Sequence, residues 1–391
     1  MNEQRDYRAR GVLGGDGRVL DGGCVRVAGG RVVEVLARPS GVAEDLGDVL
    51  ITPTFFNAHC HLELTAFEGR LPRDQGFGAW VRELMRLRDE APPAELEQAA
   101  RRGARRLWDT GCALVHDVDT TGAAARALLD VPIEAVVHRE AIDAGDATRR
   151  AARLEELDRP LPLRAGLTEG ISPHAPFTCS LELLRELGAL ARRRRLPLTM
   201  HWAETEEEVR YLRDGSGPLA ELLPPSPRRS GLDLIEAAGL LAPDLRLSLV
   251  HGNHPAPGDY ERLAAAGVPL VHCPGTHAFF GRRAFDARAV LDAGVRLLLG
   301  TDSAASNDRL DMAAELRRFL EIDEVTFQEG WRAATGGVVL EGSRRLAVWS
   351  VAGTVRDLED LVASGRSPAT FALPDGPAHA SDGPSRYPVG S

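Results

Sequence analysis

The chain has 391 residues, of which 43% are hydrophobic and 27% are charged, and its formal net charge is −10. This length suits one barrel-sized domain with a small accessory domain, and an acidic chain without a dense basic stretch argues against nucleic-acid binding. The sequence contains no lysine, so all 47 residues counted as Lys or Arg are arginine. The missing lysine excludes Schiff-base chemistry, a pyridoxal phosphate anchor, a Walker-type phosphate loop and a dinuclear metal centre bridged by a modified lysine.

The five cysteines are odd in number, scattered, and without a Cys-x-x-Cys spacing. This pattern argues against a disulfide framework and against a cysteine zinc site. The first residues lack an apolar core, and no apolar run reaches membrane-spanning length. We therefore expect no signal peptide, no membrane partner and a cytoplasmic location.

Taken in order, the chain changes its pattern near residue 50. Residues 1–49 alternate apolar and polar positions between glycine turns, which predicts the N-terminal part of a small accessory β-sandwich. Residues 50–342 alternate strand-like and helical patterns, which predicts an α/β fold, a (β/α)8 TIM-type barrel. The expected strands cover residues 50–56, 113–116, 133–137, 163–171, 197–200, 245–250, 268–271 and 295–299. Residues 343–373 are expected to complete the sandwich, and residues 374–391 to form a disordered tail.

Ionisable residues recur at the ends of these predicted strands. His59 and His61 lie at the tip of the first strand, where the two-residue period points both side chains the same way. Four more groups follow the fourth, fifth, sixth and eighth strands: His174, His201, His251 and Asp302. A single buried histidine is usually a satisfied core residue. Because the carboxyl ends of barrel strands face one mouth, the repetition predicts that these groups converge on a site.

Imidazole and carboxylate groups suit a borderline-soft divalent metal ion. We predict one ion per chain, zinc before iron, with these ligands: His59, His61, His201 and Asp302. Such an ion lowers the pKa of a bound water from about 16 toward about 7. His251 and Asp302 are predicted catalytic residues that take the proton of this water and orient it.

Glu204 lies three residues after His201, where the predicted strand gives way to a helix. A glutamate at this point could simply open the helix, which is the expected role of residues 206–208. Its place in the turn at the mouth favours a catalytic role instead. We predict that Glu204 moves a proton to a ring nitrogen of the substrate.

Together these residues resemble the amidohydrolase superfamily, in particular its mononuclear aminohydrolase branch of cytosine, guanine, adenosylhomocysteine and chlorotriazine enzymes. The matching stretches follow the family's order and cover residues 57–61, 172–176, 201–205, 250–252 and 300–303. Within the branch, residues 57–64, 215–221 and 273–281 look most similar to bacterial 6-aminodeoxyfutalosine deaminases, which serve menaquinone biosynthesis. The family's usual C-terminal signature is replaced here, so the resemblance carries no contacts over to the C-terminal segment.

The resemblance also suggests residues that contact the substrate at the mouth. The candidates are Glu63, Trp80, Arg139, His174 and His277. Of these, His174 would contact the leaving group or a carbonyl of the substrate. Trp80 is equally well explained as core packing of the helix after the first strand, and His277 as a solvent-exposed residue.

The reaction that the resemblance implies is hydrolytic deamination of an amino-substituted nitrogen heterocycle, similar to a purine nucleoside and with 6-aminodeoxyfutalosine as one candidate. Hydroxide on the metal attacks the ring carbon that carries the amine, Glu204 shuttles the proton, and ammonia leaves. The alternatives are a cyclic amidase or a dehalogenating chlorohydrolase on a heterocycle, and a metal-binding protein without turnover. The expected partner is the small-molecule substrate, and a homodimer is left open.

Overall fold

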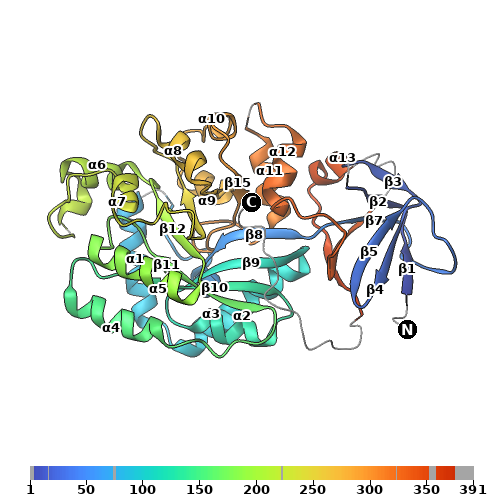
Figure 1. Ribbon diagram of the computed structural model, residues 1–391, viewed down its shortest axis with the longest axis horizontal. Helices are drawn as coiled ribbons and strands as arrows, with labels where there is room; N and C mark the ends of the chain where they lie inside the picture. The colour runs from blue at the N-terminus through green and yellow to red at the C-terminus, as the bar shows by residue number, and fades with distance from the viewer. Residues whose placement is uncertain are drawn as a thin grey trace.

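A computed structural model describes residues 4–15, 17–73, 76–221, 223–322, 324–351 and 358–374 of the chain. Its largest sheet has eight parallel strands in the order β15-β14-β13-β12-β11-β10-β9-β8, with helices around it (Figure 1). The strands are β8 Phe55–Cys60, β9 Cys112–Asp119, β10 Glu134–Ala141, β11 Leu167–Pro173, β12 Leu198–Trp202, β13 Leu247–His251, β14 Leu270–His272 and β15 Leu297–Leu299.

The first and last strands of this sheet meet just after β15. There the backbone N–H of Asp302 donates to the carbonyl of His59 at 3.0 Å, and Cys60 and Asp302 form a parallel bridge. Gly300 permits this approach, because a Cβ at its position would lie 2.7 Å from the His59 carbonyl oxygen. The sheet therefore closes on itself, and the predicted TIM-type barrel is confirmed.

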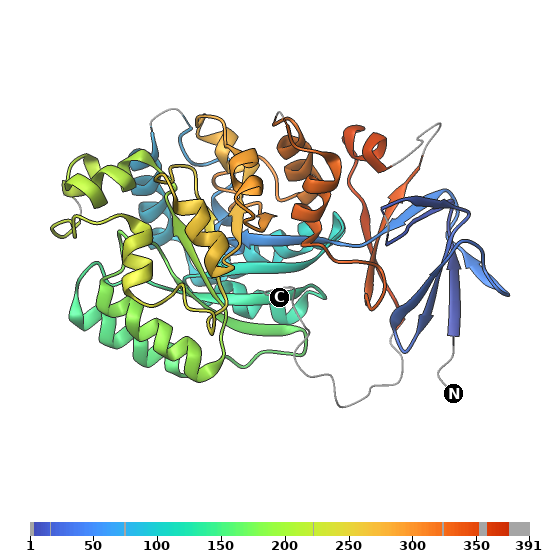
Figure 2. The same ribbon diagram turned by 45° about the horizontal axis from the view of Figure 1, so that its top comes forward.

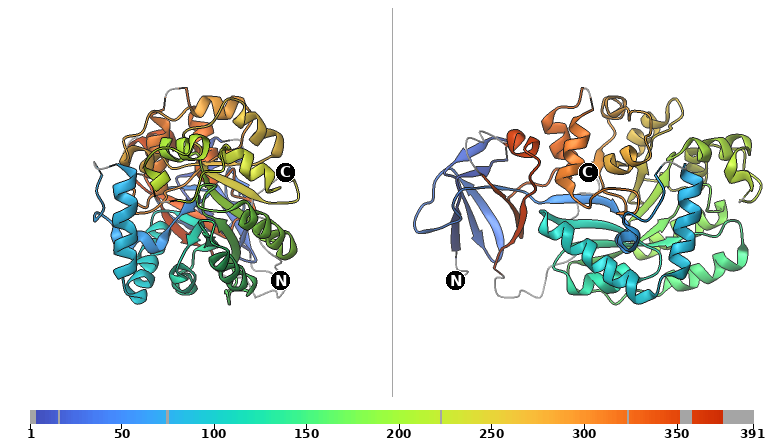
Figure 3. Two further views of the ribbon diagram at one scale, coloured as in Figure 1. Left: turned by 90° about the vertical axis from the view of Figure 1, so that its left-hand side faces the viewer. Right: turned by 180° about the vertical axis from the view of Figure 1, so that it is seen from behind.

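Amphipathic helices cover the outside of the barrel (Figure 3). They are α1 Phe77–Glu90, α2 Pro93–Asp109, α3 Ala123–Ala127, α4 Ala147–Asp158, α5 Leu181–Arg194, α6 Glu206–Asp214, α7 Gly231–Ala237, α8 Asp259–Ala266, α9 Pro274–Phe279, α10 Ala287–Asp292, α11 Met312–Leu320 and α12 Phe327–Thr335. Short polar side chains cap several of them: Ser180 accepts from the backbone N–H of Leu183 at the start of α5. A cap of this kind stabilises a helix by about 1 kcal/mol. No helix among the described residues is long and apolar enough to cross a membrane.

The side chains of the barrel strands form two apolar layers, one between the sheet and the helices and one inside the barrel. In β10, Ala135, Val137 and Ala141 belong to the large cluster that the helices cover. A smaller cluster contains Phe56 of β8 and Val250 of β13. Successive strand residues point to opposite faces, so the even-numbered residues of β10 face the barrel interior.

Two smaller sheets lie beside the barrel (Figure 2). One has the order β5-β4-β1-β6 and the other β17-β16-β7-β2-β3. Their strands are β1 Gln4–Arg8, β2 Gly11–Leu13, β3 Val19–Asp21, β4 Cys24–Ala28, β5 Arg31–Leu36, β6 Ala43–Asp45, β7 Val49–Thr52, β16 Arg345–Ser350 and β17 Ala369–Ala372. Apolar side chains from both sheets form one cluster, for example Val25 with Ile51 and Leu346. The description of this region as a β-sandwich stays a prediction.

The predicted strand over residues 50–56 is wrong, because this stretch contains parts of two strands. β7 ends at Thr52 and pairs with β2 and β16, whereas β8 begins at Phe55 and pairs with β9. Pro53 separates them, since proline cannot donate a hydrogen bond to a ladder. β8 therefore leads away from the accessory sheets, and its carboxyl end lies at the far end of the barrel. Apart from Pro374, the predicted tail 374–391 lies outside the described residues.

Candidate metal centre and active site

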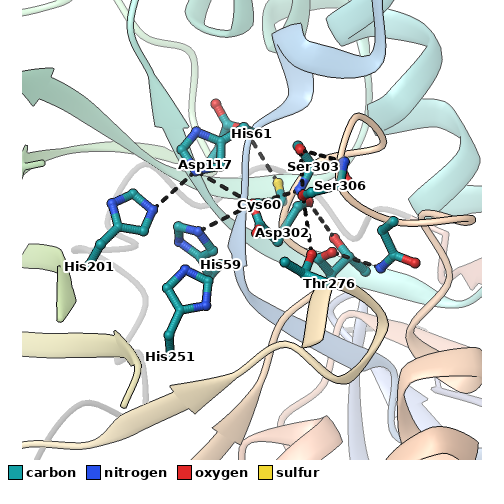
Figure 4. A network of polar contacts seen from close by, with 12 residues as sticks. His59, Cys60, His61, Asp117, His201, His251, Thr276, Asp302, Ser303 and Ser306 are labelled. Carbon is teal, nitrogen blue, oxygen red and sulfur yellow. Dashed lines mark hydrogen bonds and ion pairs between the residues drawn. The ribbon is translucent and has the colours of Figure 1, made fainter. Parts of the chain in front are cut away.

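Four predicted ligands converge at the carboxyl ends of the barrel strands (Figure 4). His59 belongs to β8, His61 follows that strand directly, His201 belongs to β12 and Asp302 follows β15: all four are buried. The Nε2 atoms of His61 and His201 are 3.3 Å apart. Oδ1 of Asp302 lies 3.8 Å from Nε2 of His59 and 3.7 Å from Nε2 of His61. One ligand atom from each of His59, His61 and His201 lies within 4.8 Å of the others, and the Asp302 oxygen is close to two of them, a spacing that suits a single ion.

The side chains of this cluster are held in place by contacts behind them. Nδ1 of His201 lies 2.9 Å from the carbonyl oxygen of His174, so Nδ1 donates and the lone pair of Nε2 faces the cluster. Asn57 joins the two strands that carry His59 and Asp302. Its Nδ2 donates to Thr301 Oγ1 at 2.8 Å, and its Oδ1 accepts from the Thr301 N–H at 3.0 Å.

Three residues at the mouth have positive φ although none is glycine. Ala203 has φ 49°, His251 has φ 76° and Asp302 has φ 54°. A non-glycine residue held in this region costs about 1–3 kcal/mol, and such residues cluster at functional sites. Each lies at or just after the end of a barrel strand, so the unusual backbone occurs where the chain turns at the mouth.

Three histidines at the mouth, His59, His61 and His251, are neutral at neutral pH because burial lowers the pKa of each. Burial lowers the pKa of His61 to about 3 and that of His251 to about 4, and burial also lowers the pKa of His59. Both ring nitrogens of His59 are buried without a hydrogen-bond partner among the described residues. Buried polar atoms normally have partners, and neutral imidazole is the form that binds a metal. The donor set and these unpartnered nitrogens fit a divalent metal ion.

His251 lies beside the same cluster, at the end of β13. One donor atom from each of His59, His251 and Asp302 lies within 4.8 Å of the others. Its ring is stacked against that of His201, with centroids 5.4 Å apart. Its Nε2 is 3.8 Å from Oε2 of Glu204. His251 is thus placed between the candidate ligands and Glu204.

Glu204 lies in the turn between β12 and α6, and its carboxylate is buried. Burial alone raises the pKa of this group, but His251 and Arg282 outweigh it and lower the pKa to about 2. Arg282 donates from Nη2 to Oε1 of Glu204 at 2.8 Å. The turn is fixed from behind by Glu208, which accepts from the backbone N–H groups of Ala203 and Glu204. These contacts therefore fix the Glu204 carboxylate at the mouth of the barrel.

Two of the predicted substrate contacts lie near this cluster. His174 follows β11, and its ring centroid is 4.9 Å from that of His201. Glu63 lies in the 3-10 helix η1 Leu62–Phe67 and accepts hydrogen bonds from the backbone and hydroxyl of Thr121. Burial raises the pKa of Glu63 to about 7, helped by Asp119.

The other two candidates at the mouth make contacts with protein atoms. Trp80 in α1 donates from Nε1 to the carbonyl of Ala305 at 3.1 Å and packs in an apolar cluster with Leu64 and Phe67. These contacts match the alternative of core packing. His277 in α9 has Nδ1 3.3 Å from Oδ1 of Asn253 and Nε2 2.5 Å from the Arg283 carbonyl. Both of its ring nitrogens are therefore directed at protein oxygens.

The placement of Arg139 corrects the expectation that it contacts the substrate. Its position in β10 is odd-numbered, so its side chain points to the helix layer and away from the barrel interior. It donates to Glu169 Oε1 at 3.0 Å and to the carbonyl of Glu156 at 2.8 Å. The next residue, Glu140, is the one that faces the cluster. Burial raises the pKa of Glu140, but His174, His61 and His201 outweigh it and lower the pKa.

The sequence reasoning missed Glu140 and Arg282. The alternation of β10 puts Glu140 on the same face as His138, but only the strand register in the structure shows that this is the inward face. Arg282 lies in the loop between α9 and α10, 78 residues from its partner Glu204. No spacing pattern links the two, so sequence carried no signal for the pair.

This barrel, with its cluster of histidines and carboxylates at the mouth, agrees with a match of residues 50–336 to the Amidohydrolase family. The chain belongs to this family, as predicted, and is a hydrolase that acts on carbon–nitrogen bonds.

Two relatives of this chain are named as deaminases. An aminodeoxyfutalosine deaminase of Deinococcus radiodurans is 32% identical over 336 residues, which cover 79% of this chain and 77% of that protein. A 5-methylthioadenosine/S-adenosylhomocysteine deaminase of Pyrococcus abyssi is 27% identical over 312 residues, which cover 75% of this chain and 68% of that protein.

The solved structures agree on the fold. Helicobacter pylori aminofutalosine deaminase in complex with methylthio-coformycin has a TM-score of 0.81 at 18% identity, with 96% of this chain and 100% of that chain covered. A zinc-bound adenosine deaminase from Xanthomonas campestris has a TM-score of 0.76 at 22% identity, with 95% and 92% covered. At these identities the likeness shows the fold.

Proposed function

We propose that this chain is a metal-dependent deaminase that removes the exocyclic amine of a purine-nucleoside-like heterocycle. The observation that carries the proposal is the buried cluster of three imidazoles and one carboxylate, with the carboxylate of Glu204 beside it. Relatives named as deaminases of adenosine-like compounds support the same reaction class.

The residues that would hold one divalent ion are His59, His61, His201 and Asp302, with zinc proposed before iron. When bound, such an ion supplies a water of lowered pKa as the nucleophile. The carboxylate of Asp302 is the base proposed to accept one proton of the attacking water, and His251 is proposed to help orient that water. Both groups lie within one cluster with His59.

Glu204 has a separate task. An amine-bearing ring carbon becomes electrophilic when its neighbouring ring nitrogen gains a proton. Because Glu204 has a pKa of about 2 and is ionised, we propose that it first takes the other proton from the attacking water and then passes it to this nitrogen. A second proton must then reach the amine so that ammonia leaves and the ring keeps a carbonyl oxygen. Glu204 and Asp302 reach this region from different strands, so each can serve one of the two transfers. His174, beside His201, is proposed to contact the substrate at the leaving side.

The finer proposal is that the substrate is 6-aminodeoxyfutalosine, which would place the enzyme in menaquinone biosynthesis. The support is the Deinococcus radiodurans relative, which is similar over more than three quarters of both proteins. Glu63 and Glu140 are proposed to face the polar part of this substrate, because both are buried carboxylates near the strand ends at the mouth. Cytoplasmic location and a homodimer stay predictions.

The test is a screen of ammonia release by zinc- and iron-loaded protein. The panel contains 6-aminodeoxyfutalosine, 5-methylthioadenosine, S-adenosylhomocysteine, adenosine, guanine and an aminotriazine. The proposal expects ammonia in equal amount to an oxo product on at least one adenosine-like compound, with 6-aminodeoxyfutalosine preferred. A ring-opened acid or a released halide would favour the cyclic amidase or chlorohydrolase, and binding without turnover would favour a metal-binding protein.

A further inference from the structure

Arg282 makes two contacts with the same residue, and that residue is Glu204. Its Nη2 donates to Oε1 of Glu204 at 2.8 Å, and its Nη1 donates to the Glu204 backbone carbonyl. The side chains are only 9% and 12% exposed. A planar guanidinium that grips a carboxylate and a carbonyl of one residue fixes the rotamer of that residue.

Two aromatic rings hold the guanidinium in turn. The Cζ atom of Arg282 lies 4.8 Å from the ring centroid of Phe280 and 5.8 Å from that of Phe77. The two rings pack against each other with centroids 5.7 Å apart. Phe77 is the first residue of α1 and Phe280 is the C-cap that follows α9, so the position of Arg282 depends on two segments of the chain.

The backbone of Glu204 does not need Arg282. Glu208 accepts from its N–H at 2.8 Å, and Asn253 donates to its carbonyl at 3.1 Å. In the part of the chain that the structure describes, Arg282 is the only side chain that donates a hydrogen bond to the Glu204 carboxylate. The direction of that carboxylate, and not the path of the chain, is therefore what Arg282 determines.

We propose that Arg282 is a positioning residue, which aims the Glu204 carboxylate at the substrate and is itself kept in place by Phe77 and Phe280. This inference rests on the proposed function, because it gives Glu204 the role of proton carrier. A purely structural ion pair is the competing explanation. It would change stability without a preference for the step that uses Glu204.

The test compares Arg282→Met, which keeps the bulk, and Arg282→Lys, which keeps the charge, in the parent and in the Glu204→Gln background. In the parent, Arg282→Met should lower kcat by about 10- to 100-fold, with KM changed less than about threefold and metal content unchanged. Arg282→Lys should recover only part of the loss, because an ammonium is a point donor. In the Glu204→Gln background, Arg282→Met should change kcat by less than about threefold, since the group it positions is gone.

The matched control is Arg283→Met on the same loop, whose side chain is exposed and should leave kcat as in the parent. Equal losses from Arg282→Met in both backgrounds, or a loss confined to KM, would overturn the positioning role. If the parent turns over no amine, the proposed function fails. Crystal structures of the parent and of Arg282→Met then decide this inference separately. A Glu204 carboxylate that has turned away from His251 in the variant supports it, and an unmoved carboxylate overturns it.

Discussion

The mouth of the barrel and the two accessory sheets differ in how their buried polar groups are paired. At the mouth, buried atoms such as Nε2 of His59 and Oε1 of Glu63 have no hydrogen-bond partner among the described residues. In the accessory sheets, the core is apolar and a partly buried charge such as Arg26 is paired with both oxygens of Asp6, at 2.9 and 3.0 Å. Buried donors and acceptors at the mouth thus lack protein partners, as expected of a ligand-binding site, whereas Arg26 in the accessory sheets is fully paired with Asp6. Among the described residues of the accessory sheets, Nε of Arg345 is a buried atom that also lacks a partner.

The largest expected loss of kcat follows from replacing Asp302, which lies at the mouth of the barrel. Asp302→Ala should lower kcat by roughly 10⁴-fold or more, because it removes a candidate metal ligand and the proposed base together. The barrel should stay folded, since residues at the carboxyl ends of barrel strands serve chemistry more than stability. Activity assays with circular dichroism check both statements. Asp308→Ala, an exposed aspartate on the following loop, is the control, and loss of the folded spectrum in Asp302→Ala would mark the residue as structural.

The next effect concerns Glu204. Glu204→Gln keeps the shape and the hydrogen-bonding reach but cannot carry a proton, so kcat should fall by about 10²–10⁴-fold while metal content and substrate binding persist. Glu206→Gln, in the exposed first turn of α6, should leave kcat at the parent value. Steady-state kinetics and elemental analysis give the answer. Turnover of Glu204→Gln near the parent rate would show that the proton comes from another group.

The accessory sheets should show the reverse pattern. Ile51 is fully buried in the cluster between the two sheets, so Ile51→Ala should lower the free energy of unfolding by about 2–5 kcal/mol. Metal content and kcat of the folded protein should match the parent. Urea unfolding measures the loss, with Val33→Ala at a half-exposed position as the control, expected within about 0.5 kcal/mol of the parent. A large fall in kcat of folded Ile51→Ala would mean that the two regions are not independent.

A smaller effect is expected from a buried carboxyl group behind the mouth. Glu315 accepts from the backbone N–H of Gly275 and from Asn307, and burial raises its pKa to about 8. The unfolded chain loses this proton near pH 4.5 and the folded chain only near pH 8, so the group makes folding less favourable as pH rises between these values. Relative to Glu315→Gln, the parent should lose on the order of 1–3 kcal/mol of unfolding free energy from pH 5 to pH 8. Urea unfolding at both values is the check, and parallel pH dependence in the two proteins contradicts the assignment.

The sequence was sufficient for the barrel and for the convergence of the histidines, because strand ends repeat at fixed topological positions and parallel strands bring them to one mouth. The sequence was insufficient where a residue's role depends on which way its side chain points or on contact with a distant loop. Arg139 and Glu140 are neighbours in sequence, yet the alternation of β10 places them on opposite faces, and the exact strand register was needed to choose between them. The pairing of Arg282 with Glu204 depends on how two loops meet over the barrel, which no local pattern encodes.

Residues 50–56 show a third kind of limit. Their apolar side chains fit one strand by hydrophobicity alone, but Pro53 divides them between two sheets with different partners. The proline is visible in the sequence. The sequence does not show that the segment before it, β7, pairs with β2 and β16. Pairing between distant segments is a tertiary property, and a single apolar run does not reveal it.

We claim that the mouth of the barrel holds one metal ion, and the metal content of the active protein is the direct check. Elemental analysis should find one divalent ion per chain, and anomalous diffraction should place it about 2.0–2.2 Å from the ligand atoms of these residues: His59, His61, His201 and Asp302. Two ions per chain, an ion bound away from these residues, or full activity without metal would contradict the claim.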